Sequence, residues 1–265
     1  MNRKRYYVVL VLLFFTVSSA YLLGRVLVPE QYEIVKVIDG DTVVLNDSSH
    51  SLVRYIGIDT PEILTVDTPG EPFSSDATEF NKELLEGRKI RLEFDKEKYD
   101  RYGRLLAYVY ADDILVNEEI VKRGLADSLE IEPNIKYRDR IRRALKQAQD
   151  SKVGIWSDPD NYHTPKANKT FLIKPSRSDD YIGQSVVVRG KITNYRKSDK
   201  VLVLKIENDL DIVIFKSDWD NFDFFGIKPE IYYVGSPVEA IGRIKLYKGH
   251  TQIIVNHPIT LRKLL

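Results

Sequence analysis

The sequence predicts an α+β protein, in which a small β-barrel with helices packed against it is followed by a second, all-β barrel. Three observations lead to this prediction. From residue 32 the apolar side chains follow the period of two that is typical of strands. Three stretches with a period near 3.6 are inserted between the first strands or follow them. After residue 182 the alternation of short strands and turns resumes.

The first barrel is expected to contain five strands, at residues 33–38, 42–45, 52–58, 89–94 and 105–110. Asp39-Gly40 is typical of a tight hairpin between the first two strands. A first helix is predicted where apolar residues recur at Phe73, Ala77, Phe80 and Leu84, and Gly87 closes it. Two further helices are predicted at residues 116–123, before Gly124, and at residues 137–149.

The second barrel is expected to contain strands at residues 185–193, 201–207, 211–215, 237–246 and 252–255. Glycines occur where barrel corners are expected, which favours the OB type. The predicted organisation is an N-terminal segment 1–29, a first domain 30–158, a basic linker 159–178 and a second domain 179–265. The linker has no acidic residue between Thr164 and Ser178. It is interpreted as a solvated spacer, and an electrostatic grip on phosphate is the alternative.

The N-terminus is typical of an export element. Residues 2–5 are Asn-Arg-Lys-Arg, and an apolar stretch follows from Tyr6 to Leu23. A basic head before an apolar run predicts that the rest of the chain lies outside the cytoplasm. The length, on the order of 20 residues, favours an apolar helix that stays as a membrane anchor. Ser18-Ser19-Ala20 resembles a signal-peptide cleavage site, so secretion after cleavage at Ala20 is the alternative.

The composition narrows the chemistry. The formal net charge of the 265 residues is +1, so any nucleic-acid surface must be local. The absence of cysteine excludes disulfides, thiolate zinc sites and thiol nucleophiles. The four histidines do not have the spacing of metal ligands, so a bound metal is expected to have oxygen ligands.

Three polar clusters in the first barrel are the candidate site. Residues 38–42 form a hairpin turn that places Asp41 at the start of a strand. Residues 53–62 form a strand that ends in two carboxylates, Asp59 and Glu62. Residues 100–104, Asp-Arg-Tyr-Gly-Arg, form a tight turn before the next strand.

Each cluster contributes a chemical group. Arg54 is expected on the strand face of Leu52, Ile56 and Ile58, where the core should lie, so it needs an anionic partner. That partner is either a structural carboxylate or a substrate phosphate, which arginine binds bidentately. Asp41 and Asp59 are suited to Ca²⁺ or Mg²⁺.

Three more residues complete this candidate site. The Thr60 carbonyl is a further possible ligand because Pro61 keeps Thr60 extended. Glu62 is the candidate general base for a water molecule. Arg104 would supply a second cation opposite Arg54.

These clusters, in this order, resemble the staphylococcal nuclease family. The resemblance covers about residues 33–157 and includes the segments 93–96, 106–110, 116–118 and 155–157. It implies an OB-type barrel with three helices and Ca²⁺-dependent hydrolysis of DNA and RNA that leaves 3′-phosphates. By position, the residues that resemble the family's calcium ligands are Asp41, Asp59 and Thr60. Glu62 resembles its general base, and Arg54 and Arg104 resemble its phosphate clamps. Arg101 and Tyr102 resemble its contacts to a terminal phosphate.

The sequence departs from the family after the second helix. The family has tyrosines there that flank the nucleotide base, whereas residues 124–132 contain no aromatic ring. Glu130 and Glu132 are expected to repel phosphate. The resemblance therefore implies weaker nucleotide affinity or an altered preference, with the chemical step retained.

The second barrel resembles OB-type modules attached to exported nucleases. Its aromatic and basic side chains are interpreted as a stacking groove for single-stranded nucleic acid, and ordinary packing is the alternative. These side chains are Tyr195, Phe215, Trp219, Tyr232, Tyr233 and Tyr247, with Lys191, Arg196, Lys197, Arg243 and Lys245. Two rival functions remain, a non-catalytic surface receptor for nucleic acid and a structural adaptor. The presence of Arg54, Glu62 and Arg104 favours the nuclease.

Overall fold

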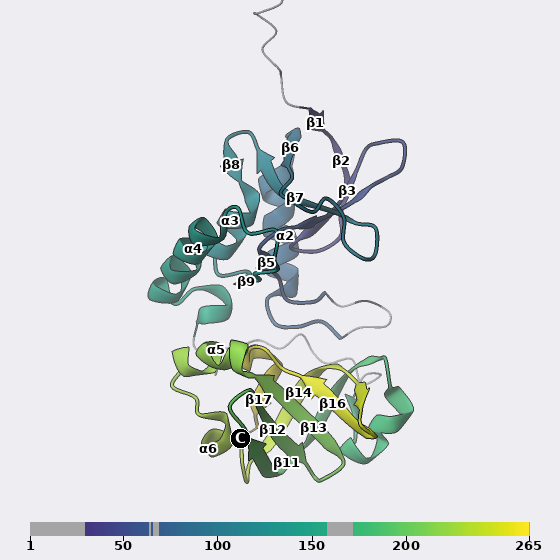
Figure 1. Cartoon of the computed structure of the whole chain (residues 1–265), viewed down its shortest axis with the longest axis vertical. Coiled ribbons are helices and arrows are strands. Elements are labelled where there is room, and N and C mark those ends of the chain that lie inside the picture. Colours follow the sequence, from purple (N-terminus) through teal and green to yellow (C-terminus); the bar gives the residue numbers. More distant parts are fainter. Residues whose placement is uncertain (1–29, 64, 66–68, 158–171, 265) are drawn as a thin grey trace, which may run out of the picture. The chain divides into compact units, whose positions relative to one another are not determined.

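A computed structural model describes residues 30–63, 65, 69–157 and 172–264 (Figure 1). The predicted N-terminal apolar helix at residues 1–29, its cleavage site after Ala20, and residues 159–171 of the predicted linker lie outside the described residues. Within the described part of the chain, no helix is both long enough and apolar enough to span a bilayer. Tyr32–Leu265 forms one compact unit.

The first sheet contains the five predicted strands. They are β2 (Ile34–Val37), β3 (Thr42–Leu45), β4 (Leu52–Tyr55), β6 (Ile90–Glu93) and β7 (Leu105–Ala111), with the short strands β1 (Gln31–Tyr32) and β8 (Ile114–Leu115) at its margins. Along the sheet the order is β2-β3-β4-β7-β6. β4 and β7 are parallel, with Val53 opposite Leu105, and the other pairs along this path are antiparallel. The polar clusters before β3, after β4 and before β7 are therefore brought to neighbouring strands.

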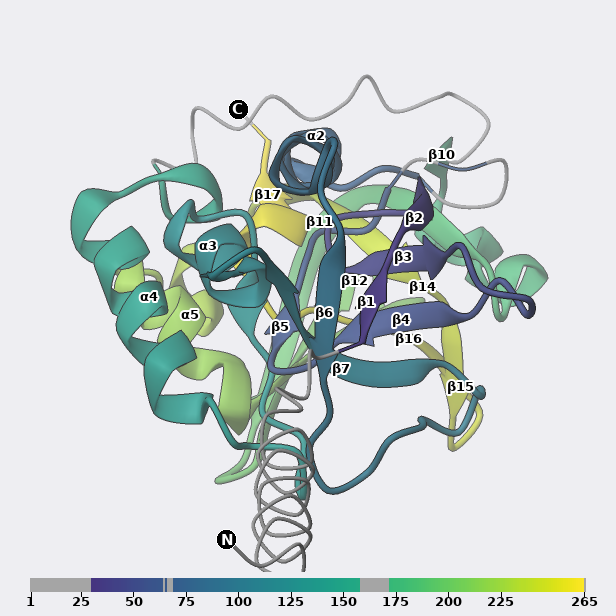
Figure 2. The same ribbon diagram turned by 90° about the horizontal axis from the view of Figure 1, so that it is seen from above.

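The three predicted helices are present as α2 (Ser74–Leu85), α3 (Val116–Lys122) and α4 (Arg138–Ser151). α3 and α4 pack side by side (Figure 2). Gly124 ends α3 with a φ of +74°. A Cβ atom at this position would lie 2.2 Å from the Val153 carbonyl oxygen, so the approach of the two segments requires glycine.

The predicted strand at residues 52–58 is interrupted by a turn. Gly57 has a φ of +84°, and after it β5 (Ile58–Asp59) pairs with β9 (Asp127–Ser128) in a separate small sheet. Val53 and Tyr55 face the core, whereas Leu52, on the Arg54 face, is 41% exposed. The expectation that Arg54 shares a core-facing side with Ile56 and Ile58 was wrong, because the turn at Gly57 breaks the strand alternation.

The second sheet has the same strand connectivity as the first sheet. Its strands are β10 (Leu172–Ile173), β11 (Ser185–Lys197), β12 (Val201–Ile206), β13 (Leu210–Phe215), β14 (Pro237–Arg243), β15 (Lys245–Tyr247), β16 (His250–Ile254) and β17 (Leu261–Lys263). The order is β15-β16-β13-β12-β11-β14-β17, with β13 and β16 parallel. When β11, β12, β13, β14 and β16 are numbered along the chain, they lie in the order fourth, first, second, third, fifth. This is a cyclic permutation of the first sheet's order, which is first, second, third, fifth, fourth, and in both sheets the third and fifth strands are parallel. This shared order is that of the OB plan.

The second barrel is not all-β, which corrects the prediction. Between β13 and β14 lie two short helices, α5 (Trp219–Phe224) and α6 (Pro229–Tyr232). Phe222 of α5 and Ile227, which lies between the two helices, are buried in the barrel core. Helices of six and four residues are too short to give a periodic signal in the sequence. Residues 172–173, which the linker prediction included, form β10 and pair with β11.

A third apolar cluster lies apart from the two barrel cores. It joins Trp156 after α4 to Phe224, Phe225 and Ile259 of the second barrel. The Trp156 ring meets the Phe224 ring edge-on at 5.2 Å and the His257 ring at 4.9 Å. Asn221 also donates a hydrogen bond of 2.8 Å to Asp127. Aromatic packing of this kind holds the two barrels in one unit.

Candidate active site

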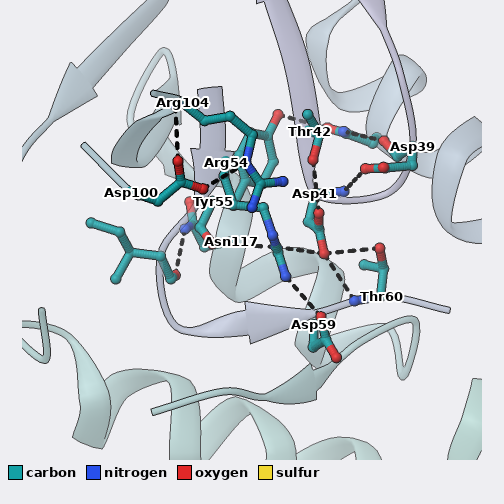
Figure 3. A network of polar contacts seen from close by, with 12 residues as sticks. Asp39, Asp41, Thr42, Arg54, Tyr55, Asp59, Thr60, Asp100, Arg104 and Asn117 are labelled. Atoms are coloured by element: carbon teal, nitrogen blue, oxygen red, sulfur yellow. Dashed lines mark hydrogen bonds and ion pairs between the residues drawn. The ribbon is translucent and has the colours of Figure 1, made fainter. Parts of the chain in front are cut away.

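Arg54 occupies the centre of the polar network and bridges two carboxylates (Figure 3). Its NH1 lies 2.6 Å from Asp41 Oδ2, and its NH2 lies 2.7 Å from Asp59 Oδ1. The Arg54 side chain is 13% exposed. Thus Arg54 does have anionic partners, and they are the two carboxylates predicted as metal ligands.

Asp41 is fixed by its neighbours on both oxygens. Its Oδ2 accepts hydrogen bonds of 3.0 Å from the Thr60 N–H and the Thr60 hydroxyl, and its Oδ1 accepts one from Thr42. The Tyr55 N–H donates to the Asp41 carbonyl at 2.9 Å, which ties the hairpin to β4. The structure thereby brings Asp41, Asp59 and Thr60 together around Arg54.

Asp39 and Asn81 support this site and were not predicted as part of it. Asp39 Oδ1 accepts the Asp41 N–H at 3.0 Å. Asn81, on α2, donates to the Asp39 carbonyl and accepts from the Tyr55 hydroxyl. The signal available in the sequence was an asparagine four residues after Ala77, on the predicted apolar face of the helix.

The carboxylate cluster has too little positive charge around it. Burial raises the pKa of Asp59 to about 7, and the opposing effect of Arg54 does not prevent the rise. Burial together with the charge of Asp41 raises the pKa of Asp39 to about 6. Asp59 Oδ2 makes no hydrogen bond or ion pair to any described residue. A divalent cation with oxygen ligands would supply the missing charge, so this donor set fits Ca²⁺.

Few protein side chains are available as ligands for a metal ion at this site. Among the described residues, no three His, Cys, Asp or Glu side chains are grouped as a metal site. The predicted set contains two carboxylates and the Thr60 carbonyl. Ca²⁺ accepts backbone carbonyls and water molecules as ligands, so two carboxylates are compatible with a partly hydrated ion.

Glu62 lies within electrostatic range of the arginines. Burial and Asp41 raise the pKa of the Glu62 carboxyl, and Arg54, Arg243 and Arg104 oppose this rise. The Glu62 N–H donates to Glu71 Oε2 at 3.0 Å, and the Glu71 N–H donates to the Glu62 carbonyl at 2.8 Å. Glu71, which sequence reasoning missed, thus fixes the backbone that carries the candidate base.

Arg104 is oriented by Asp100. Its Nε lies 2.7 Å from Asp100 Oδ2, while Asp100 Oδ1 accepts the N–H groups of Tyr102 and Arg104 at 2.9 Å. The terminal nitrogens of Arg104 make no hydrogen bond to the described residues. They remain free to bind an oxyanion. The cluster 100–104 was predicted, but the positioning role of Asp100 within it was not.

The predicted phosphate contacts line one cavity of 530 Å³. They are Arg54, Arg101, Tyr102 and Arg104. Tyr102 is 69% exposed, and its hydroxyl accepts a hydrogen bond of 2.6 Å from Arg101. Glu62 does not line this cavity. It lines a second one, of 320 Å³, with Asp59 and Thr60, and the Arg54–Asp59 contact connects the two groups of residues.

Some residues of the acidic segment 124–132 line the 530 Å³ cavity. Leu129, Ile131 and Glu132 line it. Glu130 instead pairs with Arg142, whose NH2 lies 2.9 Å from Glu130 Oε2. The charge of Glu130 is therefore compensated, which removes one of the two expected sources of phosphate repulsion.

The residues of the predicted stacking groove do not all lie on the surface. Tyr233 is buried and donates to the Leu261 carbonyl at 2.8 Å. Trp219 packs against the second core. Tyr195, Phe215 and Tyr247 are exposed. The groove prediction is wrong for Tyr233, because strand and helix packing use its ring inside the barrel.

Comparison with known proteins agrees with the first-barrel geometry. A family model described as "Staphylococcal nuclease homologue" matches residues 52–158. The thermonuclease of Staphylococcus hyicus is 45% identical over 130 residues, which are 49% of this chain and 77% of that protein. The thermonuclease of Staphylococcus intermedius is 43% identical over 128 residues, 48% of this chain and 76% of that protein.

A third relative is named as an endonuclease. The endonuclease YncB of Bacillus subtilis (strain 168) is 44% identical over 125 residues, 46% of this chain and 59% of that protein. The family model ends at residue 158, so these comparisons give no name to the second barrel. The sequence identity extends over three quarters of the length of two thermonucleases, and the first barrel assembles the site described above. The chain therefore belongs to the staphylococcal nuclease family.

Proposed function

We propose that the chain is a Ca²⁺-dependent phosphodiesterase that hydrolyses DNA and RNA and leaves 3′-phosphates. The observation that carries the proposal is the Arg54 guanidinium held between Asp41 and Asp59, with Glu62 and Arg104 in electrostatic range. A base and two cations around one phosphate are the groups that phosphodiester hydrolysis requires. The names of the relatives, thermonuclease and endonuclease, support the same reaction.

Asp41, Asp59 and the Thr60 carbonyl would hold Ca²⁺. When bound, the ion supplies Lewis acidity and orientation at a phosphoryl oxygen. Glu62 accepts the proton of the attacking water, because its carboxyl lies near the cluster and its backbone is fixed by Glu71. The Thr60 hydroxyl and N–H keep Asp41 in place during the reaction.

The two arginines bind the phosphoryl oxygens. Asp100 holds Arg104 by Nε, so the terminal NH1 and NH2 groups point away from that ion pair towards substrate. Arg54 offers a buried, planar guanidinium. A well-placed donor of this kind stabilises the transition state by about 3–4 kcal/mol. Arg101 and Tyr102, at the exposed part of the cavity, contact a terminal phosphate.

We also propose that the N-terminal segment places the barrels outside the cell. The basic residues Arg3, Lys4 and Arg5 before the apolar stretch support this orientation. The protein is then membrane-anchored, or secreted if it is cleaved after Ala20. Mapping the N-terminus of the exported protein distinguishes the two outcomes. Binding of single-stranded nucleic acid by the second barrel is a further proposal, supported by the exposed rings of Tyr195, Phe215 and Tyr247.

The test incubates the full chain with plasmid DNA and with RNA, in calcium or in a chelator. Cleavage is expected in calcium alone, and the ends should resist polymerase extension until a phosphatase removes the 3′-phosphate. Glu62→Gln should abolish cleavage, whereas Glu86→Gln, an exposed matched control, should retain it. Nucleic-acid binding without cleavage would support the receptor instead, and neither binding nor cleavage would support the adaptor.

A further inference from the structure

The 320 Å³ cavity beside Glu62 has walls from both barrels. The first barrel contributes Asp59, Thr60, Glu62 and Glu71. Strands β14 and β15 of the second barrel contribute Arg243 and Lys245. One wall is therefore acidic and the other basic. A polynucleotide that reaches Glu62 enters this space, where the acidic wall alone would repel its phosphates.

Arg243 and Lys245 differ from other cations of the second barrel. Arg189 and Arg262 pair with Glu239, and Lys205 pairs with Asp211. In the described part of the chain, by contrast, neither Arg243 nor Lys245 forms an ion pair with a carboxylate. The exposed cations that line the cavity thus keep their capacity to bind an anion.

Arg243 is held in place without being neutralised. Its NH1 donates to the Gly183 carbonyl at 2.9 Å, which leaves the other N–H groups of the guanidinium free of described partners. Arg243 and Glu62 line the same cavity, so the two charges are within range of each other. Arg243 and Glu62 do not form a salt bridge with each other. The Arg243 guanidinium can therefore bind an anion that enters the cavity from solvent.

The contact between the barrels fixes where these cations lie. The Trp156 ring packs against the Phe224 and His257 rings, and Asn221 donates to Asp127. Asp127 belongs to β9, which pairs with β5, the strand that carries Asp59. The second barrel is therefore linked through β9 to the element that supplies a predicted metal ligand.

We propose that Arg243 and Lys245 bind a backbone phosphate of a nucleotide that flanks the cleaved one, so that the second barrel completes the polynucleotide site of the first. This inference rests on the proposed nuclease function. The ligand class is a polynucleotide longer than the two nucleotides joined by the cleaved bond. A substrate with a single phosphodiester would not reach these residues.

The test compares two double variants of the full chain that remove the same charge. R243Q/K245Q removes the cavity cations and keeps polar side chains of similar length. K200Q/K228Q removes two exposed cations that do not line the cavity. The probe is a fluorescent single strand of about 20 nucleotides, longer than the about 4–16 that one OB fold covers. Its binding is measured by anisotropy in a chelator, so the reading does not depend on cleavage.

R243Q/K245Q should weaken binding by about 5- to 10-fold. It should also reduce the slope of log affinity against log salt by about 0.7, because the two cations bind one backbone phosphate and each phosphate neutralised on a single strand contributes about 0.7. In calcium, the KM for the long strand should rise by a similar factor, while kcat/KM for a nucleotide diester with one scissile bond should fall by a clearly smaller factor. K200Q/K228Q should stay within about twofold of the unmodified chain on every reading.

Equal binding by the two double variants would overturn the inference, as would an equal loss on the short diester. The single variants R243Q and K245Q, each checked for folding by urea unfolding, should each give about half of the slope change. If the unmodified chain cleaves nothing in calcium but R243Q/K245Q still loses binding, the proposed function fails and the phosphate subsite stands.

Discussion

Arg104→Lys separates a role in the transition state from a role in folding. Lysine keeps the positive charge but loses the planar fork that binds two phosphoryl oxygens. The Arg104 side chain is 32% exposed, and its one carboxylate partner is Asp100, at 2.7 Å. A solvent-screened pair of this kind contributes about 0–1 kcal/mol to the free energy of unfolding. The variant should therefore fold with a nearly unchanged urea midpoint.

The expected effect on turnover is much larger. The free terminal nitrogens of Arg104 line the cavity with Arg54, where they meet the phosphoryl oxygens. Loss of one such positioned donor costs about 2.7–4 kcal/mol in the transition state, which is roughly a 100- to 1,000-fold fall in kcat. A fluorogenic single-stranded DNA in saturating calcium measures this fall directly.

Arg91→Lys is the matched control. Arg91 is 30% exposed, lies 3.4 Å from Glu93 and has its guanidinium 4.0 Å from the Tyr110 ring centre, so it resembles Arg104 in burial and pairing. It does not line the 530 Å³ cavity. Its kcat should stay within about twofold of the unmodified chain. The assignment of Arg104 is refuted if Arg104→Lys keeps its turnover, or if the two variants lose turnover equally.

Three further predictions concern the base, the metal and the contact between the barrels. Glu62→Gln should lower kcat by about 100- to 10,000-fold while single-stranded DNA still binds in a chelator, and a smaller loss would exclude Glu62 as the base. Asp59→Asn should weaken calcium binding by at least about tenfold in calorimetry without nucleic acid, and unchanged affinity would place the ion elsewhere. Burial lowers the pKa of His257 to about 3, and the Ile259 N–H donates to its Nδ1 at 3.2 Å. Below pH 6.5 the unfolded chain therefore binds a proton at His257 that the folded chain does not, and this residue lowers the free energy of unfolding by an amount that approaches about 1.4 kcal/mol per pH unit. His257→Asn lacks this dependence, so in urea unfolding its stability gap to the unmodified protein should narrow by about 1 kcal/mol between pH 6.5 and 5.5, and a constant gap would contradict the prediction.

Local turn chemistry was readable from the sequence. Asp39-Gly40 predicts the hairpin before β3, and the hairpin places Asp41 beside the sheet as expected. The periodicity near Ala77 predicts α2, and Gly124 predicts the end of α3. In each case the deciding interaction lies within a few residues along the chain, so the sequence pattern contains it.

Long-range contacts were not readable in this way. Arg54 was singled out because it was expected to point towards the core, yet the turn at Gly57 makes that reason wrong. Its site arises instead because the β2–β3 hairpin and β5 bring Asp41 and Asp59 to either side of one guanidinium. Asn81 was missed as a supporting residue because its partners, the Asp39 carbonyl and the Tyr55 hydroxyl, lie far away along the chain and are brought near only by folding.

The sequence alone thus determined the two barrels, the three helices of the first barrel and the residue types of the candidate site. Only the tertiary structure decided which charges face one another. The parallel pairing of β4 with β7 connects residues about fifty positions apart, Val53 and Leu105, and the packing of Trp156 on His257 connects residues of different barrels. Such pairings depend on the summed packing of whole sheets rather than on local periodicity, and for that reason the cavity shared by Glu62 and Arg243 had no counterpart in the sequence pattern.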